Sequence, residues 1–272
     1  MKRIGILGCG AIGTQIALAI DSGRIPATLT HVYDIEQSHA ENLVSKLKQK
    51  PEVVSNSHLL SSNSVELVVE AASQDAVRND AVSILQNKKD MMIMSAGALL
   101  DESIFEVISD ACRDFGKTVY LPSGAIAGLD ALKSVRDELE SVVLVTTKNP
   151  NSLKDAPFFD SSDIDPEKIS EPTILFDGTA KEAVSLFPKN VNVSALLSLV
   201  GLGGDNTSVR VVADPNTDKN MHEISANGKF GNMKIIVENV PDSMNPKTSR
   251  LATLSAVELL RQICTKEIQI GT

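Results

Sequence analysis

Apolar positions in the first 122 residues fall into short continuous runs that alternate with longer amphipathic segments. The runs are "RIGILG", "TLTHVYD", "VELVVEAAS", "DMMIMSAG" and "TVYLPSG", and each predicts a strand. The first is apolar on consecutive positions, as expected for a strand buried on both faces. Between them, segments such as "AIGTQIALAIDSG" and "DESIFEVISDACRDFG" carry apolar residues at helical spacing. Strands that alternate with helices of this length predict a parallel sheet with right-handed crossovers.

After Gly124 the pattern changes to apolar or alternating runs without long helices between most of them. These runs, from "SVVLVTTKNP" to "NMKIIVENV", predict an antiparallel sheet with a hairpin at "NGKFGN". Two predicted helices interrupt it, "AKEAVSLFP" and "VNVSALLSLVG", and Thr179 and Glu182 are spaced as a capping box at the start of the first. Residues 155–172, rich in Asp, Ser and Pro, predict a surface loop. The segment from 248 to about 264 predicts a helix that packs on the first domain.

A glycine-rich turn, "GCGAIG", connects the first predicted strand to the first predicted helix. Gly8 permits the tight turn, Gly10 lets backbone approach a pyrophosphate, and Gly13 allows close helix–strand packing. Ala11 and Ile12 complete the loop, and the helix N-terminus presents unpaired N–H groups to the phosphates. A motif that follows a strand and opens a helix predicts a dinucleotide site. The alternative is a glycine turn that binds nothing.

Asp34 ends the second predicted strand, 21 positions beyond Gly13. A carboxylate there accepts hydrogen bonds from the ribose hydroxyls of the adenosine half and repels a 2′-phosphate. The following residues, "DIEQSHAEN", include no Arg to offset that repulsion, so NAD is the expected cofactor and NADP the alternative. Small-residue runs, "EAASQ" and "SAGA", end two later strands at the edge where ligands bind, although such runs equally suit tight helix packing.

These patterns predict an α/β protein with a Rossmann dinucleotide-binding domain over 1–122, an α+β catalytic or dimerisation domain over 123–244, and a helix within 245–272 that returns to the first domain. The net charge of −9 and pI near 5.0 argue against nucleic acid, because phosphate binding needs a basic face. No apolar stretch approaches the roughly 20 residues of a membrane span. Three scattered cysteines give no metal site or disulfide framework and indicate a reducing, cytoplasmic setting.

The only histidine beyond residue 58 is His222, in "NMHEI". A single histidine on an apolar strand is more often structural than catalytic, so its position alone does not decide its role. Several segments together, however, resemble the L-aspartate dehydrogenase family along most of the chain. They are "GCGAIG", "VEAASQDAV", "SGAIAGLDAL", "FPKNVNVSA", "VADPNTDKNMHEI", "GKFGNM" and "NPKTSRLA". Each is weakly specific alone, whereas their order and spacing across two domains are strong evidence.

The resemblance implies roles for particular residues. The family's catalytic histidine lies in an N-x-H-E-I context, so the resemblance implies that His222 is the catalytic residue here. Nicotinamide-side cofactor contacts fall on Ala125 of "SGAI" and Asn190 of "FPKN"; Ala127 stands where many members carry Gly and touches neither position. The implied reaction is oxidation of L-aspartate by NAD to iminoaspartate, which water hydrolyses to oxaloacetate and ammonia. An imidazole, whose ordinary pKa is about 6.5, suits activation of that water.

A dicarboxylate substrate also needs cations, and Lys148, Lys189 and Lys247 are candidates because they lie in the resembling motifs. The alternative for each is a solvated surface lysine. The family further implies a homodimer, and either a link to quinolinate synthase in NAD biosynthesis or a role as an amino-acid dehydrogenase. Two other functions stay open: a reductase of the homoserine dehydrogenase or dihydrodipicolinate reductase type, although no paired histidines occur, and a non-catalytic NAD sensor.

Overall fold

The computed structural model describes residues 1–188, 192–242, 244–245, 248–265 and 268. The chain divides into two compact units. The first comprises Met1–Pro122 together with the stretch that begins at Thr253, and the second comprises Ser123–Ala252. The sequence had placed the return to the first domain earlier, at residue 245. Each unit is described by itself below.

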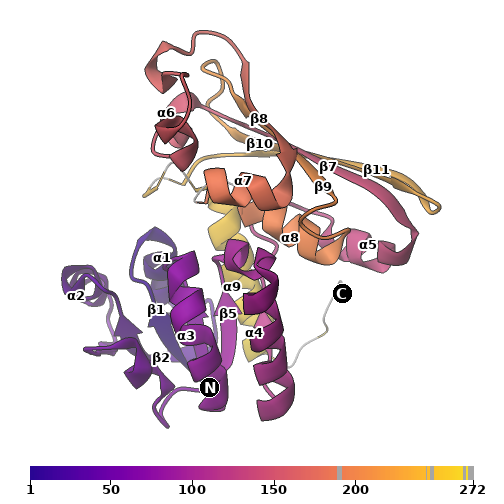
Figure 1. The fold of residues 1–272 in the computed structure, drawn as a ribbon. Coiled ribbons are helices and arrows are strands. Elements are labelled where there is room, and N and C mark those ends of the chain that lie inside the picture. Colours follow the sequence, from indigo (N-terminus) through magenta and orange to yellow (C-terminus); the bar gives the residue numbers. More distant parts are fainter. Residues whose placement is uncertain (189–191, 243, 246–247, 266–267, 269–272) are drawn as a thin grey trace. The chain divides into compact units, whose positions relative to one another are not determined.

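The first unit is built on a six-stranded parallel sheet with the strand order β3-β2-β1-β4-β5-β6 (Figure 1). This order and the intervening helices are those of a doubly wound Rossmann fold, so the predicted fold class is confirmed. The strands are β1 (Lys2–Leu7), β2 (Ala27–Tyr33), β3 (Glu52–Val53), β4 (Leu67–Glu70), β5 (Asp90–Ile93) and β6 (Val119–Tyr120).

Helices cover the sheet and complete the core of this unit. They are α1 (Ala11–Asp21), α2 (Gln37–Ser45), α3 (Gln74–Gln86), α4 (Glu102–Phe115) and α9 (Arg250–Cys264), with the 3-10 turns η1 (Ser57–Ser61) and η2 (Ala96–Leu100). Asp101 caps α4 by accepting backbone N–H groups, and Gly116 ends it in the left-handed conformation. Ala256 and Leu260 of α9 lie fully buried in the same apolar cluster as Ile4 of β1. The last helix therefore helps to build the core of the first unit.

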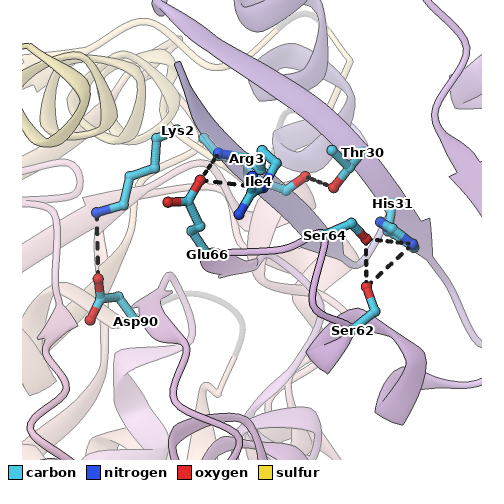
Figure 2. A network of polar contacts seen from close by, with 9 residues as sticks. All are labelled: Lys2, Arg3, Ile4, Thr30, His31, Ser62, Ser64, Glu66 and Asp90. Atoms are coloured by element: carbon cyan, nitrogen blue, oxygen red, sulfur yellow. Dashed lines mark hydrogen bonds and ion pairs between the residues drawn. The ribbon is translucent and has the colours of Figure 1, made fainter.

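A network of polar contacts joins the amino ends of β1, β4 and β5 (Figure 2). The backbone N–H of Arg3 donates to the Glu66 carboxylate at 3.0 Å, and Lys2 forms an ion pair with Asp90 at 3.4 Å. On neighbouring β2, His31 Nε2 lies 3.5 Å from the hydroxyls of two serines in the segment that leads into β4. These contacts stabilise the edge of the sheet opposite the glycine-rich turn, which follows the carboxyl end of β1.

The second unit contains a five-stranded sheet with the order β11-β10-β7-β9-β8. The strands are β7 (Leu139–Lys148), β8 (Thr173–Thr179), β9 (Thr207–Ala213), β10 (Asn220–Gly228) and β11 (Gly231–Asn239). The predicted hairpin is confirmed, because Gly228 pairs with Gly231 across its turn. The prediction of an antiparallel sheet is wrong for one pair, since β7 and β9 run parallel. Apolar runs do not reveal which strands become neighbours, and the connection between these two includes crossover helices.

Helices lie on one face of this sheet (Figure 1). The helical elements are α5 (Leu129–Ser134), η3 (Arg136–Glu138), α6 (Pro150–Leu153), η4 (Pro157–Asp160), η5 (Pro166–Lys168), α7 (Ala180–Leu186) and α8 (Asn192–Val200). The predicted capping box of Thr179 and Glu182 starts α7. The predicted loop over 155–172 contains two of the 3-10 turns. Burial along β10 alternates, and its even-numbered residues from 220 to 226 face the covered side.

Candidate active site

The glycine-rich turn at the head of α1 leaves space where a dinucleotide's pyrophosphate is expected. Gly8 has φ +99°, and a Cβ there would lie 2.6 Å from the backbone of Ala71. A Cβ on Gly13 would lie 2.0 Å from the carbonyl oxygen of Gly8. Neither position therefore admits a side chain. A Cβ on Gly10, in contrast, would meet nothing within 4 Å, so this glycine borders open space that the pyrophosphate of NAD fits.

Asp34 is held beside this turn by backbone hydrogen bonds. Its Oδ2 accepts the N–H of Cys9 at 2.7 Å, and its Oδ1 accepts the N–H of Glu36 at 2.9 Å. A carboxylate has about four lone-pair sites, so both oxygens keep capacity for ribose hydroxyls. His39 Nδ1 lies 3.5 Å from Oδ1, a contact that the sequence did not predict. Burial and the charge of Asp34 raise the pKa of the Cys9 thiol to about 12, so that thiol is not a nucleophile.

Glu70, at the carboxyl end of β4, joins the two small-residue runs that the sequence singled out. Its fully buried carboxylate accepts the N–H groups of Ala72 at 2.8 Å and Met94 at 3.1 Å. It also accepts the N–H of Ser95 at 3.0 Å and the Ser95 hydroxyl at 2.8 Å. Burial raises the pKa of Glu70, and the hydrogen bonds from Ser95 and its neighbours oppose that rise. Glu70 thus fixes the loops after β4 and β5 to each other, a role that its position within "EAASQ" did not reveal.

In the second unit His222 lies on the covered face of β10 with 1% of its surface exposed. Its Nδ1 lies 3.1 Å from Oγ1 of Thr146, the residue opposite it on β7. When Nδ1 carries the proton and donates it to Thr146, Nε2 keeps a lone pair and can act as a base. Burial, and secondarily the charge of Lys148, lowers the pKa of His222 from 6.5 to about 3. The imidazole is therefore neutral at physiological pH.

Lys148, the last residue of β7, lies on the same covered face, with 3% of its surface exposed. Burial lowers the pKa of its ammonium from 10.5 to about 8. The amine is therefore still mostly protonated at pH 7. Burial is the main reason that His222 resists protonation, and the positive charge of Lys148 adds to it. The buried ammonium also favours an anionic ligand.

Two asparagines complete this cluster. Asn220 precedes His222 by two positions and faces the same side of β10, and Asn239 is opposite Asn220 on β11. The Asn239 carboxamide donates to the carbonyl oxygen of Ala125 at 2.9 Å, which holds the segment predicted to contact nicotinamide. The Asn220 carboxamide is 1% exposed, and its Nδ2 has no hydrogen-bond partner among the residues that the structure describes. Strand alternation alone could have indicated Asn220, whereas Thr146 and Asn239 required the strand register.

The predicted site residues thus fall into two groups. The first unit brings together the glycine-rich turn and Asp34, and the second brings together His222 and Lys148, with Ala125 tied to their sheet through Asn239. Lys189, Asn190 and Lys247 lie outside the described residues. Within the described part of the chain, no group of three or more His, Cys, Asp or Glu could hold a metal ion.

A Rossmann unit with an intact dinucleotide turn, followed by a mixed-sheet unit with a buried histidine, defines an NAD(P)-dependent oxidoreductase. Two family models agree: "Homoserine dehydrogenase, NAD binding domain" matches residues 8–122, and "Aspartate dehydrogenase, C-terminal" matches residues 130–263. The chain belongs to the L-aspartate dehydrogenase family, as the sequence predicted.

Relatives match along the whole chain. An L-aspartate dehydrogenase of Nitrosopumilus maritimus is 65% identical, and one of Methanocella arvoryzae is 47% identical, each covering 100% of both chains. Among solved structures, the aspartate dehydrogenase of Thermotoga maritima is 28% identical, with a TM-score of 0.76 over 99% of this chain and 100% of that one. A homoserine dehydrogenase of Thiobacillus denitrificans, 12% identical with a TM-score of 0.59, shares the fold.

Proposed function

We propose that this protein oxidises L-aspartate with NAD to iminoaspartate, which water hydrolyses to oxaloacetate and ammonia. One observation carries the proposal: the unit that matches the aspartate dehydrogenase family holds a neutral buried histidine beside a buried lysine. A neutral imidazole accepts a proton, and an ammonium binds a carboxylate. These are the two properties that an amino dicarboxylate and its imine require of the protein.

The protein's residues divide the chemistry between them. Bound NAD supplies the hydride acceptor. His222 Nε2 takes a proton from the water whose oxygen bonds to the imine carbon, and it returns that proton to the nitrogen that leaves as ammonia. Thr146 accepts the Nδ1–H and so holds the tautomer in which Nε2 is the base.

The pKa of about 3 makes His222 a weak base in the free protein. Its causes are burial first and the Lys148 charge second. A substrate carboxylate placed against Lys148 offsets that charge, and its own negative charge favours the imidazolium. The carboxylate therefore raises the pKa of His222 when substrate is bound, while burial, the larger cause of the low pKa, remains. Lys189 and Lys247 are proposed as further carboxylate ligands.

The first unit is proposed to bind most of the cofactor. The turn with Gly8, Gly10 and Gly13 is proposed to hold the pyrophosphate, with Ala11 and Ile12 supplying backbone N–H groups at the start of α1. Asp34 is proposed to bind the adenosine ribose and to favour NAD over NADP. The nicotinamide side is assigned to Ala125 and Asn190.

The uncovered face of the second sheet supports a homodimer. Paired positions place Ile236, Glu223, Val145 and Arg210 in one row across four strands of this face. Ile236 is 55% exposed, and Ile174 on β8 is 54% exposed. We propose that a second copy of the chain covers this face. Ile236→Glu is expected to give monomers when its mass is measured by light scattering after size-exclusion chromatography. The matched control, Phe105→Glu on α4, should stay dimeric. A wild-type monomer would refute the assignment of this face to a homodimer.

The cellular setting is also proposed. All three cysteines are unpaired thiols, which suits a reducing cytoplasm. No helix in the described stretches is long and apolar enough to cross a membrane. Iminoaspartate released there would be available to quinolinate synthase for NAD biosynthesis. If oxaloacetate and ammonia accumulate even when that enzyme and its second substrate are added, the protein serves aspartate catabolism instead.

The proposal is tested by following NADH formation with L-aspartate for the wild type and for His222→Ala. A loss of at least about a hundredfold in kcat with an unchanged Kd for NAD is expected, because a general acid–base group contributes about that much. The exposed residue His58 provides the control, His58→Ala, which should keep full activity. Turnover of homoserine but not aspartate would establish the other reductase, and NAD binding without turnover of any amino acid would establish a sensor.

A further inference from the structure

The Asn220 carboxamide has an unused hydrogen-bond donor. Buried polar side-chain atoms in proteins are almost always paired. Asn220 Nδ2, in a residue only 1% exposed, has no partner among the described residues. Its opposite neighbour, Asn239, is not a partner either, and the Nδ2 of that residue donates to the Ala125 carbonyl. A donor kept unpaired in this position is therefore available to a ligand.

The position of Asn220 relative to the proposed reaction centre is set by the strands. Residues two apart on a strand face the same side and are separated by about 7 Å. Asn220 therefore stands beside His222 on the covered face of β10. Met221 pairs with Thr147, so the next residue of β7, Lys148, lies beside Asn220 on that face. The unpaired donor thus lies next to both the imidazole and the buried ammonium.

The chemistry of these neighbours defines the ligand group. The Lys148 ammonium offers only donors, and the Asn220 Nδ2 offers two more. A ligand group that satisfies both needs acceptor oxygens and negative charge, as a carboxylate has. Of the two carboxylates of aspartate, the side-chain one lies one carbon further from the reacting α-carbon. The Cα atoms of Asn220 and His222 are separated by about 7 Å along β10, so the more distant carboxylate is the one placed at Asn220.

We propose that Asn220 is a substrate-binding residue whose Nδ2 donates to the side-chain carboxylate of the substrate, beside Lys148, and that it sets the preference for a dicarboxylic amino acid. This inference rests on the proposed function and deepens it. It assigns to the first asparagine of "NMHEI" the task of recognition, while His222 two positions later performs proton transfer.

The test compares Asn220→Ala with Asn220→Asp. Asn220→Ala should raise KM for L-aspartate about ten- to a hundredfold, the range expected for a lost hydrogen bond to a charged group, and should leave kcat within a few-fold and the Kd for NAD unchanged. Asn227→Ala, on an exposed position of the same strand, is the matched control and should leave both constants unchanged. Equal KM values for the two alanine variants would overturn the proposal, as would a loss in kcat alone.

Asn220→Asp keeps the shape of the side chain, so it tests the proposal even if the alanine variant does not fold. Its carboxylate repels the carboxylate of aspartate but accepts hydrogen bonds from the side-chain amide of L-asparagine. The ratio of kcat/KM for aspartate to that for asparagine should fall at least about tenfold. Equal losses on both substrates would assign Asn220 to the α-carboxylate and refute the side-chain assignment. A wild-type protein that does not oxidise aspartate refutes the proposed function itself, which separates the two failures.

Discussion

Raising the pH from 7 to 9 should weaken dicarboxylate binding through the titration of one lysine. Burial lowers the pKa of Lys148 to about 8. The protonated fraction in the free protein therefore falls from roughly nine-tenths at pH 7 to roughly one-tenth at pH 9. If only the ammonium binds a carboxylate, the affinity for succinate should drop about tenfold over this interval. Succinate suits the measurement because its own carboxyl groups stay ionised throughout.

Isothermal titration calorimetry with NAD present measures both the Kd and the protons exchanged. At pH 9 succinate binding should take up nearly one proton per site, seen as a dependence of the heat on the ionisation enthalpy of the buffer. Lys148→Arg keeps its charge at both pH values, so its Kd should not change with pH. Lys148→Met should bind weakly at both. A wild-type Kd that stays constant from pH 7 to 9, without proton uptake, would refute the role of Lys148.

Three further outcomes are expected. Gly13→Ala places a Cβ 2.0 Å from the Gly8 carbonyl oxygen, so the turn must shift, and the Kd for NAD should rise at least about tenfold in a titration. Glu70→Gln turns an NH₂ group toward backbone N–H donors and should lower the free energy of urea unfolding by about 1–3 kcal/mol. His222 binds a proton near pH 6.5 when unfolded but only near pH 3 when folded, so acidification between these values should remove up to about 4–5 kcal/mol of stability through this group. His222→Gln should remove this contribution from the pH dependence of stability.

The sequence predicted the parts of the protein that depend on local patterns. The turn with Gly8, Gly10 and Gly13 can be recognised from the spacing of its glycines. Gly8 and Gly13 leave no room for a side chain, and Gly10 borders open space. Continuous apolar runs predicted the parallel strands, because a strand buried on both faces carries apolar residues at consecutive positions. Glu70 escaped prediction because its four hydrogen bonds reach residues up to 25 positions away, and neither carboxylate burial nor those partners can be read from neighbouring residues.

In the second sheet, local sequence patterns did not predict which strands become neighbours. Thr146 contacts His222 across 76 positions of sequence, and the parallel pairing of β7 with β9 places strands together that an antiparallel order would separate. Strand alternation gave the face of each residue but not its neighbour on the next strand. Lys148 was therefore predicted only as a carboxylate ligand, and its secondary effect on the pKa of His222 became visible only with the register.

That effect links substrate recognition to proton transfer. In the free protein Lys148 helps to keep His222 neutral and weakly basic, so a water molecule in the site gains little from it. A carboxylate bound against Lys148 and Asn220 removes part of that repulsion and raises the pKa of the imidazole. An amino acid without a second carboxylate brings no such negative charge to Lys148. With that substrate His222 therefore stays a weaker base, in addition to the loss of affinity. One buried lysine would thereby select the substrate twice, once through binding and once through the basicity of the catalytic group.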